Sequence, residues 1–154
     1  DLPDNLSTGR FWRSPMPLAA PATLFAAAVT LLAILICLAA ATMVSHTRHS
    51  TGIQPPAMGG DARLERALRV QGNTLEQFVI FLPALWLAAL YFQGWAPPVA
   101  GLAWCLGRVL YAVGYMKEAK KRSPGFAITI FSTLILLALA ATGIVQAWMA
   151  NGAV

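Results

Sequence analysis

Four long apolar runs, separated by short polar segments, dominate the pattern of residues along the chain. The first run, from Leu18 to Val44, holds 27 residues without a charge. About 20 apolar residues suffice to cross the hydrocarbon core of a bilayer, so this run predicts a transmembrane helix. The last run, from Phe126 to Ala150, is also uncharged and predicts another.

The second helix is predicted to begin in polar sequence and to become apolar only later. Asp61 is a good N-cap and begins it. Its uninterrupted apolar part, residues 78–92, is roughly 22 Å long at 1.5 Å per residue. Because the hydrocarbon core is about 30 Å thick, the span must reach back to about Asn73. This places Asn73 and Glu76 at the membrane edge or inside it.

The third helix is predicted to start at Pro97 or Pro98, where a missing N–H costs nothing, and to end near Met116. Arg108 lies near its middle. The segments between the four helices are predicted to be a loop, a tight turn and a short basic loop, at residues 45–60, 93–98 and 117–125.

The composition agrees with this fold. The chain has 154 residues, 58% of them hydrophobic and 11% charged, whereas a soluble domain has about 25% charged residues. We therefore predict an all-α membrane protein, a four-transmembrane-helix bundle with the lipid bilayer as its surroundings. We divide it into an interfacial N-terminal segment (1–17), a four-helix membrane domain (18–150) and a C-terminal tail (151–154).

The net charge of +5 does not indicate nucleic acid as a partner. The basic residues lie next to the apolar spans, which favours a role in membrane topology or in binding anionic lipid or ligand. No aromatic–basic surface motif or zinc spacing supports binding to nucleic acid. His46 and His49 have no third ligand nearby in the sequence, so we predict no metal site.

The basic residues are distributed unequally between the two sides of the membrane. With four spans, segments 45–69 and 117–125 share one side, and the other side holds only Arg10 and Arg13. The positive-inside rule therefore predicts that the first side is cytoplasmic and that both termini lie opposite. A bacterial inner membrane and the endoplasmic reticulum both remain open. The first side holds Arg48, Arg63, Arg66, Arg69, Lys117, Lys120, Lys121 and Arg122.

Polar residues form two stripes at helical spacing. In the second helix, Arg69, Asn73 and Glu76 stand at i, i+4 and i+7, which places them on one face. Such groups are costly in lipid, where a central arginine costs about 2.5–3.5 kcal/mol. We expect the stripes to face each other or a neighbouring subunit around a cation-rich pocket near the cytoplasmic ends. The second stripe consists of Arg108, Tyr111, Tyr115, Glu118 and Arg122.

These side chains suit a small zwitterion with additional carboxylates, and glutathione is one such molecule. Arginine binds carboxylates through a planar fork, and a buried glutamate accepts an ammonium. Structural interpretations stay open. Arg108 could pair with Glu76 to hold two helices together, and Glu118 with Arg122 could be a solvated pair at a helix end. The basic run that includes Arg122 could be a membrane anchor.

Two segments resemble signatures of a known family. Residues 65–76, ERALRVQGNTLE, have the pattern E-R-x-x-R-x-x-x-N-x-x-E, and residues 107–115 read GRVLYAVGY. Both resemble the helix-two and helix-three signatures of the MAPEG family, the membrane-associated proteins of eicosanoid and glutathione metabolism. The resemblance covers about residues 18–150. It implies a homotrimer of four-helix subunits, with glutathione as co-substrate bound between subunits near the cytoplasmic face.

The resemblance also implies which residues form the site. Arg122 falls where one enzyme of the family has a thiol-activating arginine, and Tyr115 is expected to donate a second hydrogen bond to the thiolate. Gln77 and His49 differ from one enzyme of the family, which has tyrosine and arginine at these positions. The expected glutathione-binding residues are Arg48, Arg69, Gln71, Asn73, Glu76, Arg108, Tyr111 and Tyr115.

We therefore expect a glutathione-dependent transferase or peroxidase acting on a lipophilic electrophile. A free thiol has a pKa of about 8.5, and a nearby guanidinium favours the thiolate. One alternative is a non-catalytic lipid-binding scaffold, which one branch of the family exemplifies. Another is an accessory subunit of a larger membrane complex that docks through residues 1–17. Arg69, Asn73, Glu76 and Arg122 favour the enzyme, because a scaffold needs no thiol site.

Overall fold

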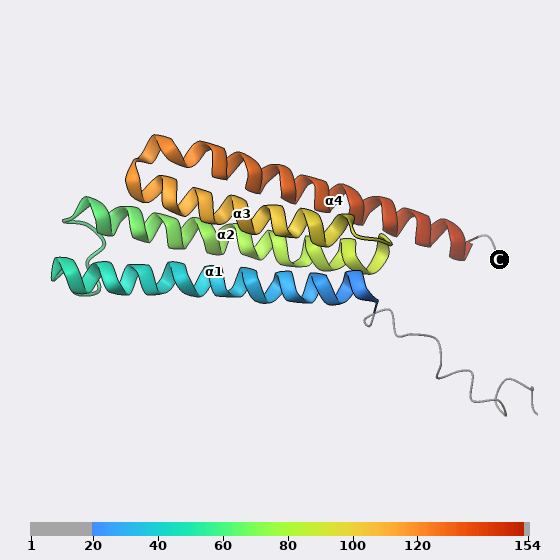
Figure 1. Cartoon of the computed structure of the whole chain (residues 1–154), viewed down its shortest axis with the longest axis horizontal. Coiled ribbons are helices and arrows are strands. Elements are labelled where there is room, and N and C mark those ends of the chain that lie inside the picture. Colours follow the sequence, from blue (N-terminus) through green and yellow to red (C-terminus); the bar gives the residue numbers. More distant parts are fainter. Residues whose placement is uncertain (1–19, 153–154) are drawn as a thin grey trace, which may run out of the picture.

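The computed structural model describes residues 20–152, which form four long helices (Figure 1). Each is long and apolar enough to cross a membrane, and no strand occurs in this part of the chain. The predicted all-α four-helix architecture is confirmed. The predicted N-terminal segment, 1–17, lies outside the described residues. The helices are α1 (Pro21–Thr51), α2 (Ala62–Tyr91), α3 (Ala96–Lys117) and α4 (Ser123–Gly152), with the short 3-10 helix η3 (Ala119–Arg122) before α4.

The helices extend further than predicted at the basic end of the molecule. α1 continues past Val44 to Thr51, so the prediction of a loop from residue 45 was wrong for its first part. The segment 117–125 was also predicted as a loop, yet η3 and the start of α4 occupy most of it. An uncharged run marks the part of a helix that lies in hydrocarbon. The helix itself continues into the headgroup region, where charged side chains are solvated.

The start of α2 agrees with the prediction from the sequence. Asp61 Oδ1 accepts hydrogen bonds from the backbone N–H groups of Arg63 at 2.7 Å and Leu64 at 3.3 Å. The side chain of Arg63 also forms an ion pair with Asp61, with 3.3 Å between Arg63 Nε and Asp61 Oδ1. These hydrogen bonds, chiefly those from Arg63, hold the pKa of Asp61 below its ordinary value. Asp61 is thus a charged N-cap at the exposed start of α2.

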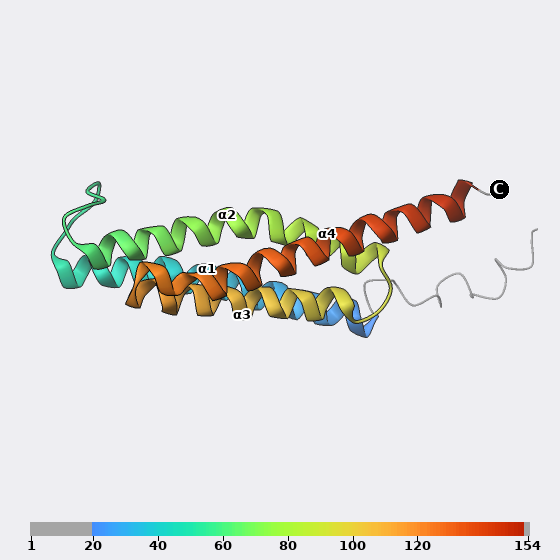
Figure 2. The same cartoon turned by 90° about the horizontal axis from the view of Figure 1, so that it is seen from above.

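The four helices pack as a bundle in which α2 and α3 are in contact with each other and with both α1 and α4. The α1–α2 and α3–α4 connections lie at one end of the bundle, and the α2–α3 turn lies at the other (Figure 1). Figure 2 shows that α4 is inclined to its neighbours and extends beyond them at its C-terminal end. The prediction that segments 45–69 and 117–125 share one side is consistent with this arrangement.

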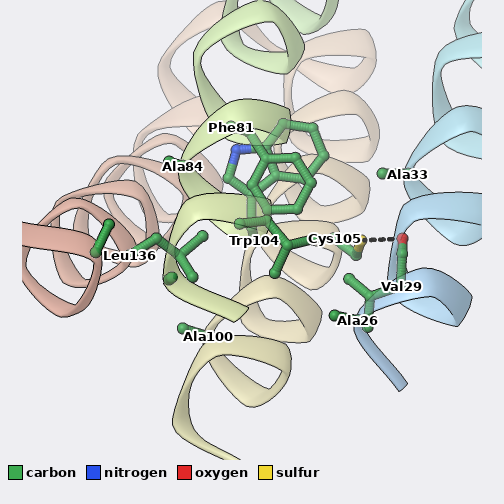
Figure 3. Packing of buried hydrophobic residues seen from close by; sticks show 12 residues of the cluster. Ala26, Val29, Ala33, Phe81, Ala84, Ala100, Trp104, Cys105 and Leu136 are labelled. Carbon is green, nitrogen blue, oxygen red and sulfur yellow. Dashed lines mark hydrogen bonds between the residues drawn. The ribbon is translucent and has the colours of Figure 1, made fainter. Parts of the chain in front are cut away.

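The core of the bundle is built around two stacked aromatic rings (Figure 3). Phe81 of α2 and Trp104 of α3 lie 4.0 Å apart between ring centroids and are nearly parallel. Cys105 donates through its thiol to the carbonyl of Val29 at 4.0 Å. The surrounding buried residues are mostly small, which allows the helices to approach closely. In lipid, where the hydrophobic effect does not drive helices together, this close packing stabilises their contacts. The small residues include Ala26, Ala33, Ala84 and Ala100.

Two glycines allow α4 to lie directly on the backbone of its neighbours. A Cβ on Gly125 would overlap the backbone N and Cα of Tyr111, and one on Gly143 would overlap the backbone of Tyr91. The first of these contacts places the beginning of α4 against the part of α3 that carries the predicted polar stripe. The outer surface is apolar, with large side chains such as Val79 and Phe131 exposed, as expected where lipid is the solvent.

Candidate functional site

The two predicted stripes meet where α2 and α3 are in contact. Asn73 of α2 donates from Nδ2 to the hydroxyl oxygen of Tyr111 on α3, at 2.5 Å. Tyr111 is buried and Asn73 is half-buried. For these two residues, the expectation that the stripes face each other within one chain is confirmed.

Arg108 lies one turn before Tyr111 and is buried, with 1% of its surface exposed. Its Nη2 donates to Thr74 Oγ1 at 2.7 Å, and its guanidinium carbon lies 4.1 Å from the centroid of the Tyr111 ring. The alternative of an Arg108–Glu76 pair is wrong for this structure, in which Glu76 is exposed. Within residues 20–152, the ion pairs are Arg63–Asp61 and Lys121–Glu118.

Tyr115 and Arg122 continue the contacts of Tyr111 toward the basic end. The rings of Tyr111 and Tyr115 lie 5.7 Å apart, and the Arg122 guanidinium carbon lies 5.2 Å from the centroid of the Tyr115 ring. Arg122 reaches this position because η3 folds back on the last turn of α3, where Gly114 leaves room for the carbonyl of Lys121.

Glu118 is oriented differently from the sequence-based alternative. It pairs with Lys121 at 3.2 Å rather than with Arg122. The predicted spacing of i, i+4 assumed a continuous α-helix, but the chain leaves α3 at Lys117 and forms η3. Its tighter turn brings the residue at i+3 alongside Glu118 instead.

Other polar residues of α2 line a groove on the open side of this helix. We call it the α2 groove; its volume is about 540 Å³. Arg69, Asn73 and Glu76 line it together, as their shared face predicts. Arg69 and Glu76 are exposed in the single chain. The other lining residues are Met58, Gly59, Glu65, Leu68 and Gly72.

A smaller cleft of about 240 Å³, which we call the α2–α3 cleft, adjoins this groove. The two share Glu65 and Arg69, and the cleft adds Tyr115 from α3 and Arg66 from α2. Arg69 therefore stands between the Asn73–Glu76 part of the site and the Tyr115–Arg122 part. A carboxylate, an ammonium and a thiol of one extended peptide could thus each meet a complementary side chain.

Four predicted ligands line neither hollow, and one of them is Tyr111, which is buried and accepts a hydrogen bond from Asn73. Arg48 donates from Nη1 to the carbonyls of Ile53, at 3.3 Å, and Ala57, at 2.7 Å, and so fastens the loop between α1 and α2. Gln71 is half-buried, and Arg108 is buried beside Thr74. Their contact with glutathione stays a prediction.

Sequence reasoning did not single out Thr74, the hydrogen-bond partner of Arg108. Its hydroxyl also donates to the carbonyl of Val70 at 2.6 Å. One signal was available in the sequence: Thr74 shares the apolar face of α2 with Val70 and Phe81, so a hydroxyl there must face another helix. Glu65 was recognised only as the first residue of the family signature and was not predicted as a site residue, yet it lines both hollows.

Comparison with known proteins decides the family. The sequence profile of the MAPEG family matches residues 24–142. The chain belongs to the MAPEG family. The matched region contains every lining residue of the two hollows, since these residues lie between Met58 and Ala119. The predicted resemblance to MAPEG proteins is confirmed.

Individual MAPEG relatives are similar over most of their length. An uncharacterized protein of Synechocystis is 45% identical over 74% of this chain and 83% of its own. Human microsomal glutathione S-transferase 2 is 36% identical over 71% of this chain and 74% of its own. Bovine leukotriene C4 synthase is 33% identical over 77% of this chain and 79% of its own.

Proposed function

We propose that this MAPEG protein is a glutathione-dependent membrane transferase or peroxidase that acts on a lipophilic electrophile. The observation that carries the proposal is the junction of the α2 groove and the α2–α3 cleft at Arg69. The similarity to human microsomal glutathione S-transferase 2 supports glutathione as the co-substrate.

The α2 groove supplies partners for the peptide part of glutathione. Arg69 presents a planar fork to a carboxylate, and Glu76 accepts hydrogen bonds from an ammonium. Asn73 uses its Nδ2 on Tyr111, so its Oδ1 is left to accept from a peptide N–H. The hydrogen bond to Tyr111 thereby sets the orientation of the amide toward the ligand.

The α2–α3 cleft is where we place the thiol. Arg122 lies over the ring of Tyr115, which lines the cleft. A guanidinium at hydrogen-bond reach of the thiol lowers its pKa from about 8.5 and favours the thiolate. The thiolate sulfur then attacks the electrophilic carbon, and the bond from that carbon to its leaving group breaks. Tyr115 donates a hydrogen bond that holds the sulfur in place.

We further propose that the active form is a homotrimer. Arg69 and Glu76 are exposed on the open side of α2, and all the lining residues of the α2 groove come from α2 and the loop before it. A neighbouring subunit at this face would close the groove over the peptide, as the family resemblance implies. We place the basic end of the bundle in the cytoplasm, where soluble glutathione can enter, in a bacterial inner membrane or the endoplasmic reticulum.

A conjugation assay tests the proposed function. The purified protein in detergent is mixed with glutathione and the generic electrophile 1-chloro-2,4-dinitrobenzene, and the thioether product is followed by absorbance. We expect turnover in the wild type, and a raised KM for glutathione in Glu76→Gln. Binding of lipophilic ligands without turnover, whatever electrophile or hydroperoxide is supplied, would favour the scaffold instead.

A further inference from the structure

A third hollow lies between α1 and α3 and shares no lining residue with the α2 groove or the α2–α3 cleft. It consists of two adjoining cavities, of about 580 and 190 Å³, that have Ile36 and Val109 in common. We call it the α1–α3 groove. Along α3 it runs from Val99 to Val113, roughly 21 Å at 1.5 Å per residue. An acyl chain can lie in it parallel to the helices.

The walls of the α1–α3 groove are apolar except for three residues. Arg108 and Thr74 line the smaller cavity, and Cys105 is the remaining polar group in the larger one. Arg108 gives one hydrogen bond, from Nη2 to Thr74. Its Nε and Nη1 are buried and have no hydrogen-bond partner in the described part of the chain.

A buried guanidinium with free N–H groups is costly. Each unpaired donor loses its hydrogen bonds to water without replacement, and within residues 20–152 the charge has no counter-ion. The ring of Tyr111, 4.1 Å from the guanidinium carbon, compensates for only part of this loss. A carboxylate that accepts from the free Nη1, with Nη2 as the neighbouring donor of the fork, would pair one of the free donors and supply the missing counter-charge.

We propose that the α1–α3 groove binds a single-chain carboxylic acid, with its carboxylate on Arg108 and its alkyl chain extending toward Leu32 and Val99. The smaller cavity, at Arg108, matches the small headgroup, and the larger, apolar cavity matches the chain. Leu106 and Val109 on the rim are exposed on the lipid-facing surface, so the acid enters sideways from the bilayer.

The depth of Arg108 distinguishes such an acid from a phospholipid. Arg108 precedes the end of α3, Lys117, by nine residues, roughly 13 Å along the helix axis. The phosphate of a bilayer lipid stays outside a hydrocarbon core about 30 Å thick. A carboxylate on a single chain is small enough to reach this depth, and a phosphodiester carrying two chains is not.

The test compares a spin-labelled stearic acid with its methyl ester, which has the same chain and no charge. Each probe is added at pH 8 to the purified protein without glutathione, and electron paramagnetic resonance measures the motionally restricted fraction. We expect the acid to bind at least about tenfold more tightly than the ester, as a charge-assisted hydrogen bond provides. Arg108→Gln should abolish this preference, and Arg108→Lys should keep part of it.

Substitutions in the groove wall supply a control that leaves the arginine intact. Val109→Trp should reduce binding of both probes, whereas Leu137→Trp, at an exposed position of α4, should change neither. If Arg108→Gln fails to fold, two results still test the proposal: the preference of the wild type for the acid over the ester, and the reduced binding of both probes by Val109→Trp.

Three outcomes would overturn the proposal: equal binding of acid and ester by the wild type, a preference that survives in Arg108→Gln, or displacement of the probe by equimolar phosphatidic acid. Because no glutathione is present, these results are separate from those of the conjugation assay. The proposed function can fail while this site stands, and the reverse also holds.

Discussion

Asn73 and Tyr111 are joined by a hydrogen bond of 2.5 Å that links α2 to α3. Asn73 lines the α2 groove, and the other side of Tyr111 is in contact with Arg108, which lines the α1–α3 groove. One tyrosine therefore separates a polar hollow from an apolar one. A substitution at Tyr111 should therefore affect both the α2 groove and the α1–α3 groove.

Tyr111→Phe removes the acceptor for Asn73 while keeping the ring beside Arg108. We expect a loss of about 0.6 kcal/mol in stability, the average for a hydrogen bond between membrane helices, and a severalfold weaker binding of glutathione. Thermal denaturation and calorimetry measure these effects. Tyr115→Phe is the matched control for thermal stability alone, because the Tyr115 hydroxyl makes no hydrogen bond within residues 20–152. Greater destabilisation by Tyr115→Phe would contradict this account.

Arg122→Ala should lower turnover far more than it lowers affinity for glutathione. Removing one preorganised donor from a developing anion costs about 10²–10³ in kcat. The pH profile should also change: the rate of the variant should rise with an inflection near the free-thiol pKa of about 8.5, and that of the wild type at a lower pH. Lys120→Ala, at an exposed position of η3, should leave both kcat and the affinity for glutathione unchanged. Equal losses of kcat and affinity would refute this role.

Gly125→Ala tests the contact between α4 and the backbone of Tyr111. The added methyl group has no space there, so we expect a loss of about 1–3 kcal/mol, as in overpacked cores. Gly72→Ala makes the same chemical change on α2, where no atom lies within 4 Å of the new Cβ. It should be tolerated. Thermal denaturation of both variants measures the difference, and similar losses would show that the close approach of α4 is not required.

Asp61 should make the stability of α2 depend on pH. Its pKa is lowered, chiefly by hydrogen bonds from Arg63. The charged cap is therefore fully present above the ordinary aspartate pKa of about 3.9 and is lost as the pH falls through the lowered value. Asp61→Asn keeps a cap that does not titrate, so its thermal stability should change less on acidification. Identical pH profiles for wild type and Asp61→Asn would contradict this assignment.

The four helices and the start of α2 could be predicted because they depend on local physics. The length of each uncharged run determines a span, and Asp61 caps its own helix wherever the helix packs. The end of α1 at Thr51 could not be predicted in this way, because a helix continues beyond the hydrocarbon without any break in its hydrogen bonds. Gly52, with a φ of 72°, ends it.

The site was predictable where residues share one helix face. Arg69, Asn73 and Glu76 line one groove because their spacing dictates it. Contacts between helices depend on how far each helix is rotated and shifted. For this reason the sequence did not reveal Thr74 as the partner of Arg108, or Lys121 as the partner of Glu118.

Calorimetric titration of glutathione tests the central claim most directly, with wild type, Arg69→Gln and Arg63→Gln compared in the same detergent. Arg63 is the matched control, since it is an exposed arginine on α2 that lines neither hollow. We predict saturable binding to the wild type, unchanged in Arg63→Gln and weakened about tenfold or more in Arg69→Gln, as expected for a lost charge-assisted hydrogen bond. Absence of binding to the wild type, or equal affinities in all three proteins, would contradict the account.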